Sequence, residues 1–176
     1  MRSIFGIVLF MLLFILALWF IQQHNQRSPQ ITPSNSLIGQ RTKEFNCVAQ
    51  GPLPDKECTP GAIFPEATVQ EICVPGYTKS VRNVPAELKR AVYAEYGVKH
   101  REKGEYEVDH HIPLELGGSN DIANLWPEPA EPRPGFHEKD KVENYLHAQV
   151  CSGRMGLRAA QSAIANDWLG VYKEIN

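Results

Sequence analysis

The balance of hydrophobic and polar positions divides the chain into three parts. Residues 4–21 form an unbroken apolar run of 18 positions without charge or proline, about the minimum length for a helix that crosses a bilayer. Residues 22–44 are polar and interrupted by proline, as expected of a flexible linker. Residues 45–176 are enough for one compact domain. The pattern therefore predicts a membrane anchor over 1–21, a linker over 22–44 and a folded domain over 45–176.

The apolar N-terminal run has a cleaved signal peptide as its alternative interpretation. The residues WFIQQHNQ at its end contain no small-x-small cleavage site, which favours a retained transmembrane helix. Arg2 precedes the run and weakly favours an amino terminus in the cytoplasm. We therefore expect a membrane-anchored domain outside the cytoplasm, in the periplasm or on the cell surface. Cleavage of the run would make the protein secreted.

The folded part contains one segment with a clear helical period. In VPAELKRAVYAEYGV, Leu88, Val92 and Tyr96 recur every four residues. Pro85 suits a first helical turn, and Gly97 is a natural stop. This segment is predicted to be an amphipathic helix.

The next segment predicts strand, turn, strand, loop and helix. YEVDHHIPLEL begins with the alternation of a strand, whose regular pairing Pro113 ends. GGSND is a turn cluster, and IANLW predicts a second strand closed by Pro127. Helical periods begin at about His137 and again at about Leu157. The predicted fold class is therefore α+β.

The cysteines indicate disulfides. They are four in number, with no Cys-x-x-Cys pair that would suggest a zinc ribbon. Four cysteines allow three pairings, and the sequence leaves all three open. The candidates are Cys47, Cys58, Cys73 and Cys151.

The formal net charge of −2 argues against a protein that coats nucleic acid by charge alone. The charges are unevenly distributed, however. Residues 79–103 are mainly basic, whereas residues 104–151 hold ten carboxylates against three basic residues. A basic arm beside an acidic segment with histidines suits a site where a polyanion meets a bound cation.

The sequence DHH, which lies just before the glycine turn, carries the candidate chemistry. Asp109 from the first strand and His137 from the start of the helix are candidate ligands of a divalent cation. His110 is a candidate general base, because imidazole takes protons near neutral pH. Asn124 is a candidate for orienting that imidazole. Each residue also has a structural alternative, such as a capped turn or a buried histidine.

The order of these residues resembles the HNH endonucleases. The matching stretch is VDHHIPLELGGSNDIANL, residues 108–125, continued to His137. More narrowly, PGYTKSVR, NLWPEP, HEKDKVENYLH and VCSG are similar to small exported bacterial HNH-like proteins. The resemblance implies a small ββα-metal core with flanking helices and disulfide-stabilised loops.

The resemblance also implies roles for individual residues. Asp109 and His137 would bind the metal, His110 would activate water, and Asn124 would orient His110. Asp140 is an alternative to His137 as the second ligand, because the helix lacks the usual Asn-x-x-Lys.

The doublet of histidines admits a second register, which resembles that of colicin-type nucleases. In it His110 binds the metal and His111 is the base. The position of Pro113 favours the first register.

The function implied is that of a metal-dependent endonuclease with weak sequence preference. Its substrate would be DNA, with RNA as a second candidate, and cleavage would leave 5′-phosphate ends. Its cofactor would be one divalent ion: Mg²⁺, Mn²⁺, Zn²⁺ or Ni²⁺. Arg82 and Lys103 of the basic arm would hold backbone phosphates, and we expect a monomer. The alternatives are an inactive HNH-fold module that binds nucleic acid or a cell-surface partner, and a structural domain held by disulfides.

Overall fold

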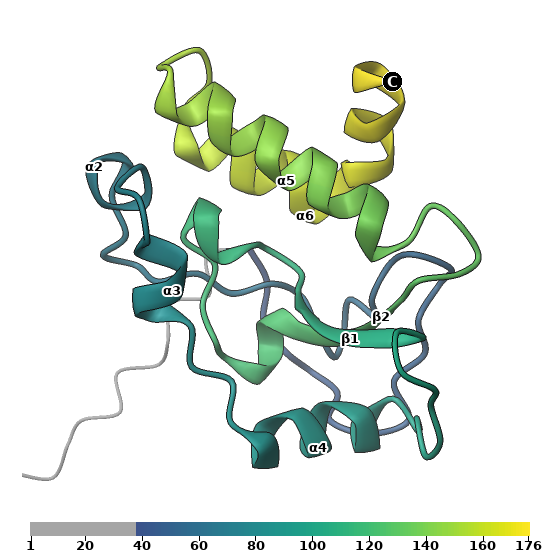
Figure 1. Cartoon of the computed structure of the whole chain (residues 1–176). Helices are drawn as coiled ribbons and strands as arrows, with labels where there is room; N and C mark the ends of the chain where they lie inside the picture. The colour runs from purple at the N-terminus through teal and green to yellow at the C-terminus, as the bar shows by residue number, and fades with distance from the viewer. Residues whose placement is uncertain (1–37) are drawn as a thin grey trace, which may run out of the picture. The chain divides into compact units, whose positions relative to one another are not determined.

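The computed structural model describes residues 38–176, and these residues are α+β (Figure 1). A two-stranded antiparallel sheet lies between helix α4 and the pair of helices α5 and α6. The elements in chain order are α2 (Val69–Ile72), α3 (Tyr77–Val81), α4 (Ala86–Glu95), β1 (Tyr106–His110), the 3₁₀ turns η1 (Leu114–Leu116) and η2 (Ile122–Asn124), β2 (Leu125–Pro129), α5 (Phe136–Cys151) and α6 (Leu157–Ile175). The predicted fold class is thus confirmed at the level of α+β.

The hairpin brings the predicted site segment into register. Tyr106 pairs with Pro129 and His110 pairs with Leu125, so the strands are matched along their whole length. Because neighbouring side chains alternate between the faces of a strand, Glu107 and Asp109 share one face of β1. Glu128, opposite Glu107, projects from the same face of the ribbon.

The second strand differs from its predicted bounds. Residues 122–124 form a 3₁₀ turn, so β2 begins at Leu125 and continues through Pro127 to Pro129. Pro127 does not end the strand, because each strand of a two-stranded sheet has an edge without a partner. A proline without an N–H is tolerated on such an edge.

The three longer helices were predicted close to their observed positions. Pro85 is the N-cap of α4, and Val92 lies on its buried face. Helix α5 begins one residue before the predicted start. Helix α6 begins as predicted, but its backbone leaves the helical region at Asp167, a bend that the sequence period did not reveal.

Two short helices precede α4. Helix α2 is a single turn whose N-cap Thr68 forms a capping box with Glu71. Helix α3, which was not predicted, starts after the left-handed Gly76 and ends at Arg82. The short α3 is important for the site because it leads directly to Arg82.

The four cysteines form two disulfides, which confirms the prediction that they are oxidised. Cys47 bonds to Cys58 and Cys73 bonds to Cys151, over sequence separations of 11 and 78 residues. The longer link ties the end of α2 to the end of α5.

The contacts of the domain begin before residue 45. Arg41 forms a salt bridge with Glu95 of α4. The backbone N–H groups of Thr42 and Lys43 both donate to the carbonyl of Glu57. The end of the segment predicted as a linker is therefore attached to the folded domain.

The hydrophobic core lies between α5, α6 and the segments that lead into and out of the hairpin. Val142, Leu146 and Val150 of α5 meet Ile164 and Trp168 of α6. This stripe follows the four-residue spacing seen in the sequence. The remaining buried members are Ile63, Ile72, Ile112, Leu116, Ala160 and Ala165.

The predicted anchor over residues 1–21 lies outside the described residues. Within residues 38–176, no helix has the length and apolarity that a membrane span requires. The two disulfides are compatible with an extracytoplasmic location.

Candidate active site

A polar cavity of about 210 Å³ opens where α3, β1, η1 and α5 meet. Asp109 and His110, the centre of the predicted site, both line it. Its lining is mostly polar or charged, unlike the core beside it. The lining residues are Thr78, Arg82, Asp109, His110, Pro113, Leu114, Glu115, Asp140, Glu143 and Asn144.

Lys139 of α5 is buried beside the cavity and contacts two of its lining residues, Asp109 and Glu143. Its side chain is 1% exposed, and its ammonium donates to Asp109 Oδ2 and Glu143 Oε1, each at 2.5 Å. It also donates to the carbonyl of His110 at 2.9 Å and lies 3.6 Å from Glu128 Oε2. A buried ammonium requires such partners, because desolvation of an unpaired charge is costly. Lys139 therefore fixes α5 against the hairpin.

The site nevertheless holds more carboxylates than cations. Six surround it in the described part of the chain, against the cations Arg82 and Lys139. The carboxylates are Glu107, Asp109, Glu115, Glu128, Asp140 and Glu143.

Burial, together with this excess of negative charge, raises the pKa of most of the carboxylates. Burial, reinforced by the charges of Asp109 and Asp140, raises the pKa of Glu107 to about 7. Burial also raises the pKa of Asp140 and, more strongly, that of Glu128. Both oxygens of Glu128 are buried without a hydrogen-bond partner. Among these six only Asp109 has a lowered pKa: burial acts to raise it, but the charge of Lys139, the hydrogen bond from Lys139 and the other nearby groups together outweigh burial.

The donor set fits a hard divalent cation. Oxygen ligands from carboxylates suit Mg²⁺, Mn²⁺ and Ca²⁺, and a cation would relieve the repulsion among these groups. Asp109, Asp140 and Glu143 line the cavity and would be the residues to hold it. Because Lys139 already engages one oxygen of Asp109, the other oxygen would be the ligand atom.

The imidazole of His110 is held in one tautomer by Asn120. The amide Nδ2 of Asn120 donates to the carbonyl of Val81 at 2.7 Å, which fixes the orientation of the amide. Its Oδ1, which also accepts from the N–H of Asn83, then faces His110 Nε2 at 3.2 Å. Because Oδ1 can only accept, Nε2 carries the proton and Nδ1 keeps its lone pair. Burial lowers the pKa of His110, so the ring favours the neutral form.

The side chain of Asn124 makes different contacts from the one expected of it. It is 0% exposed, and all four hydrogen bonds of its side chain go to backbone groups. Its Oδ1 accepts from Ile112 at 2.9 Å and Ala62 at 3.3 Å, and its Nδ2 donates to Ile112 and Ser119 at 2.9 Å each. It therefore shapes the segment between the strands, while Asn120 makes the contact to His110 that was expected of Asn124.

His111 points away from the cavity. It is 2% exposed and does not belong to the cavity lining. Burial lowers its pKa to about 3, which keeps the ring neutral within the fold. His110 is equally buried but lines the cavity, so of the two rings it is His110 that can face a group bound there.

Of the two candidates for the second metal ligand on helix α5, His137 and Asp140, only one lines the cavity. His137 is exposed, lies outside the cavity lining, and its ring contacts that of Phe136 with a centroid separation of 4.2 Å. Asp140, three residues later, lines the cavity. The structure thus brings Asp140, and not His137, together with Asp109 and His110.

The two basic residues expected to hold phosphates lie in different places. Arg82 lines the cavity. Lys103 lies in a separate open groove formed by residues 99–106, with Lys99, His100 and Arg101. Only Arg82 is positioned to contact a group bound beside His110.

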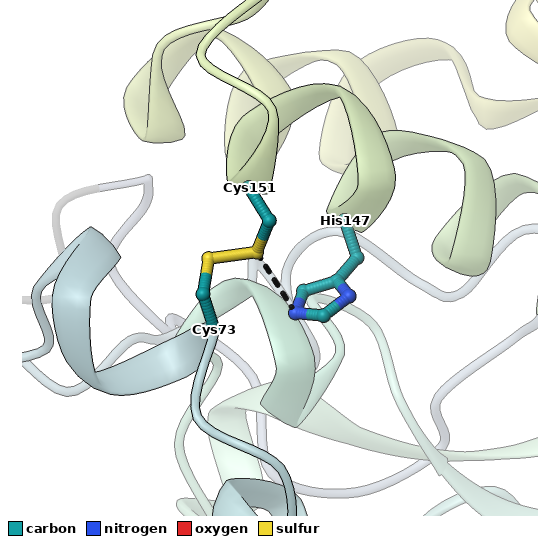
Figure 2. Close-up of side chains that lie close together, drawn as sticks. All are labelled: Cys73, His147 and Cys151. Atoms are coloured by element: carbon teal, nitrogen blue, oxygen red, sulfur yellow. Dashed lines mark hydrogen bonds between the residues drawn. A yellow bond between two sulfur atoms is a disulfide. The ribbon is translucent and has the colours of Figure 1, made fainter.

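A second group of candidate ligands lies apart from the cavity. Cys73, His147 and Cys151 have ligand atoms within 4.8 Å of one another and could hold a metal ion, although the two cysteines are joined in a disulfide (Figure 2).

Three residues at or beside the cavity were not among the predicted site residues: Glu143, which lines it, and Asn120 and Lys139, which contact His110 and Asp109. Asn120 belongs to the predicted turn cluster GGSND, and no role was predicted for Lys139 or Glu143. Their spacing of four residues along α5, with opposite charges, is a signal that places both on one helix face.

Comparisons of the chain with protein-family models, with curated proteins and with solved structures find no match.

Proposed function

We propose that this protein is a metal-dependent endonuclease of the HNH type that hydrolyses phosphodiester bonds with weak sequence preference. The observation that carries the proposal is the His110–Asn120 pair at the edge of an acidic cavity. A neutral imidazole with a fixed tautomer next to a site for a divalent cation is the arrangement needed to activate water.

His110 would act as the general base through Nδ1, taking a proton from water. Asn120 would be a positioning residue, because it holds the proton of the ring on Nε2. Arg82 at the opening would donate to a non-bridging phosphate oxygen. A divalent cation held by Asp109 and Asp140 would supply positive charge against the phosphate and the leaving oxygen.

The substrate proposed is DNA, with RNA as the second candidate. Arg82 would contact the phosphate backbone, and such contacts position a substrate without reading its sequence. The basic groove over residues 99–106 would extend these contacts. We also propose that residues 1–21 anchor the protein in a membrane and that it acts outside the cytoplasm.

The test is cleavage of supercoiled plasmid and of single-stranded RNA by the full-length, oxidised chain in mild detergent. The chain is first stripped of metal, and Mg²⁺, Mn²⁺, Zn²⁺ or Ni²⁺ is then added singly. We expect metal-dependent nicking that is lost in Asp140→Asn and retained in His137→Ala. His137→Ala is a matched control, because it removes a nearby side chain of α5 that lies outside the cavity. Loss in His137→Ala with retention in Asp140→Asn would contradict the ligand set.

A second candidate is an HNH-fold module that binds nucleic acid without cleaving it. The observation in its favour is the contact between Lys139 and Asp109, since an internal ammonium already neutralises the predicted ligand. Absence of cleavage with every metal, by a folded chain that still binds plasmid, would support this candidate over the nuclease.

A further inference from the structure

Cys73, His147 and Cys151 form a compact group on the side of α5 that faces α2 (Figure 2). Cys73 directly follows α2, while His147 and Cys151 stand four residues apart on one face of α5. The Nε2 atom of His147 lies 3.3 Å from the sulfur of Cys151. None of the three lines the cavity of the proposed active site.

In the oxidised chain the imidazole of His147 is hydrogen-bonded to a backbone carbonyl. His147 Nε2 lies 3.1 Å from the carbonyl oxygen of Ile72, which can only accept. Nε2 therefore carries the proton in this state and donates to that oxygen. His147 and Cys73 are half-buried and Cys151 is exposed, so solvent can reach the group.

We propose that reduction of the Cys73–Cys151 disulfide converts this group into a zinc site. A dithiol reductant supplies two electrons and two protons, giving two thiols, and itself becomes a disulfide. Zinc binding then releases both thiol protons to solvent. His147 moves its proton from Nε2 to Nδ1, breaks its bond to Ile72, and offers the Nε2 lone pair to the metal.

The chemistry of the ligands selects zinc. Two thiolates and an imidazole suit a borderline-soft ion, and the two negative charges neutralise Zn²⁺. Tetrahedral Zn–S bonds of about 2.3 Å place two sulfur ligands roughly 3.8 Å apart. The three ligand atoms already lie within 4.8 Å of one another, so small side-chain movements complete the site. Water takes the fourth position.

A zinc ion at this place would replace the disulfide as the link between α2 and α5. Helix α3, which carries Thr78 and leads to Arg82, follows Cys73 within a few residues. The link therefore keeps the wall of the cavity attached to α5 while the cysteines are reduced. The inference stands apart from the proposed nuclease activity, because it uses other residues.

The test is protection of the thiols in the full-length chain, reduced by a phosphine without oxygen and then given Zn²⁺. Alkylation of each cysteine is followed by mass spectrometry. Zn²⁺ should slow the alkylation of both Cys73 and Cys151, because a thiolate bound to the metal is no longer a free nucleophile. The thiols of Cys47 and Cys58 serve as internal controls that Zn²⁺ leaves unprotected.

His147→Ala should abolish most of this protection, whereas His100→Ala, which removes an exposed imidazole elsewhere, should preserve it. Both variants keep the disulfide, so their folding is verified in the oxidised state. Equal alkylation of Cys73 with and without Zn²⁺, or full protection in His147→Ala, would overturn the proposal.

Thermal unfolding supplies a second measurement. Zn²⁺ should raise the Tm of the reduced wild-type chain more than that of reduced His147→Ala. An equal shift in both would place the stabilising zinc elsewhere and refute the site.

Discussion

The substitution Asn124→Ala tests how the segment between the two strands is held. It removes four hydrogen bonds to the backbone groups of Ala62, Ile112 and Ser119 from a position that is 0% exposed. A typical buried hydrogen bond contributes about 0.5–1.5 kcal/mol. Three of the bonds measure 2.9 Å and the fourth 3.3 Å, so we expect a loss of about 3–5 kcal/mol in the free energy of unfolding.

The assay is urea denaturation of the oxidised chain, followed by circular dichroism. Asn166→Ala is the matched control, because Asn166 is exposed and its amide bonds only to Ser162 on its own helix. The control should change stability by no more than about 0.5 kcal/mol. A loss below about 1 kcal/mol in Asn124→Ala would refute the reasoning, because it would mean that these bonds are replaced by water at little cost.

Three further predictions concern links across the fold. Replacing both Cys73 and Cys151 by serine should lower the free energy of unfolding by about 4.5 kcal/mol through loop entropy, against about 2.8 kcal/mol for the Cys47–Cys58 disulfide, because the two loops span 78 and 11 residues. Urea unfolding of the two double variants measures the difference, and an equal loss in both would contradict it. Burial raises the pKa of Tyr96 to about 12, so its phenol should stabilise the fold fully below pH 10 and lose that contribution as the pH rises toward 12. The ultraviolet titration of the wild type minus that of Tyr96→Phe reports the pKa of Tyr96, and a normal midpoint near 10 would exclude the shift. Lys139→Met should cost about 3–5 kcal/mol, because it leaves three carboxylates without their buried cation; unchanged urea stability would show that these carboxylates take up protons at little cost.

Elements with local signals were predictable from the sequence. The period of Leu88, Val92 and Tyr96 identifies α4, because one face of that helix is buried and the pattern lies within the helix itself. The alternation ahead of Pro113 likewise identifies β1. In both cases the residues that define the element are close together in the chain.

The details of the site depend on contacts between distant residues. Lys139 is buried because it meets Asp109 and Glu128, which lie 30 and 11 positions away in the sequence, and no local pattern records such a meeting. The choice between His137 and Asp140 depends on the rotation of α5, and a sequence locates helix ends only to within a few residues. Asn120 and Asn124 both suit a turn, so only the path of the chain distinguishes their contacts.

The most direct test of the central claim is the single-turnover rate of plasmid nicking by wild type and by His110→Ala, at a saturating concentration of the metal that supports cleavage. If His110 is the general base, its removal should lower the rate by about 10²–10⁴, with unchanged binding of plasmid. Asn120→Ala should lower the rate less, because it disturbs only the tautomer and orientation of the ring. A rate for His110→Ala within a factor of about three of the wild type would contradict the account.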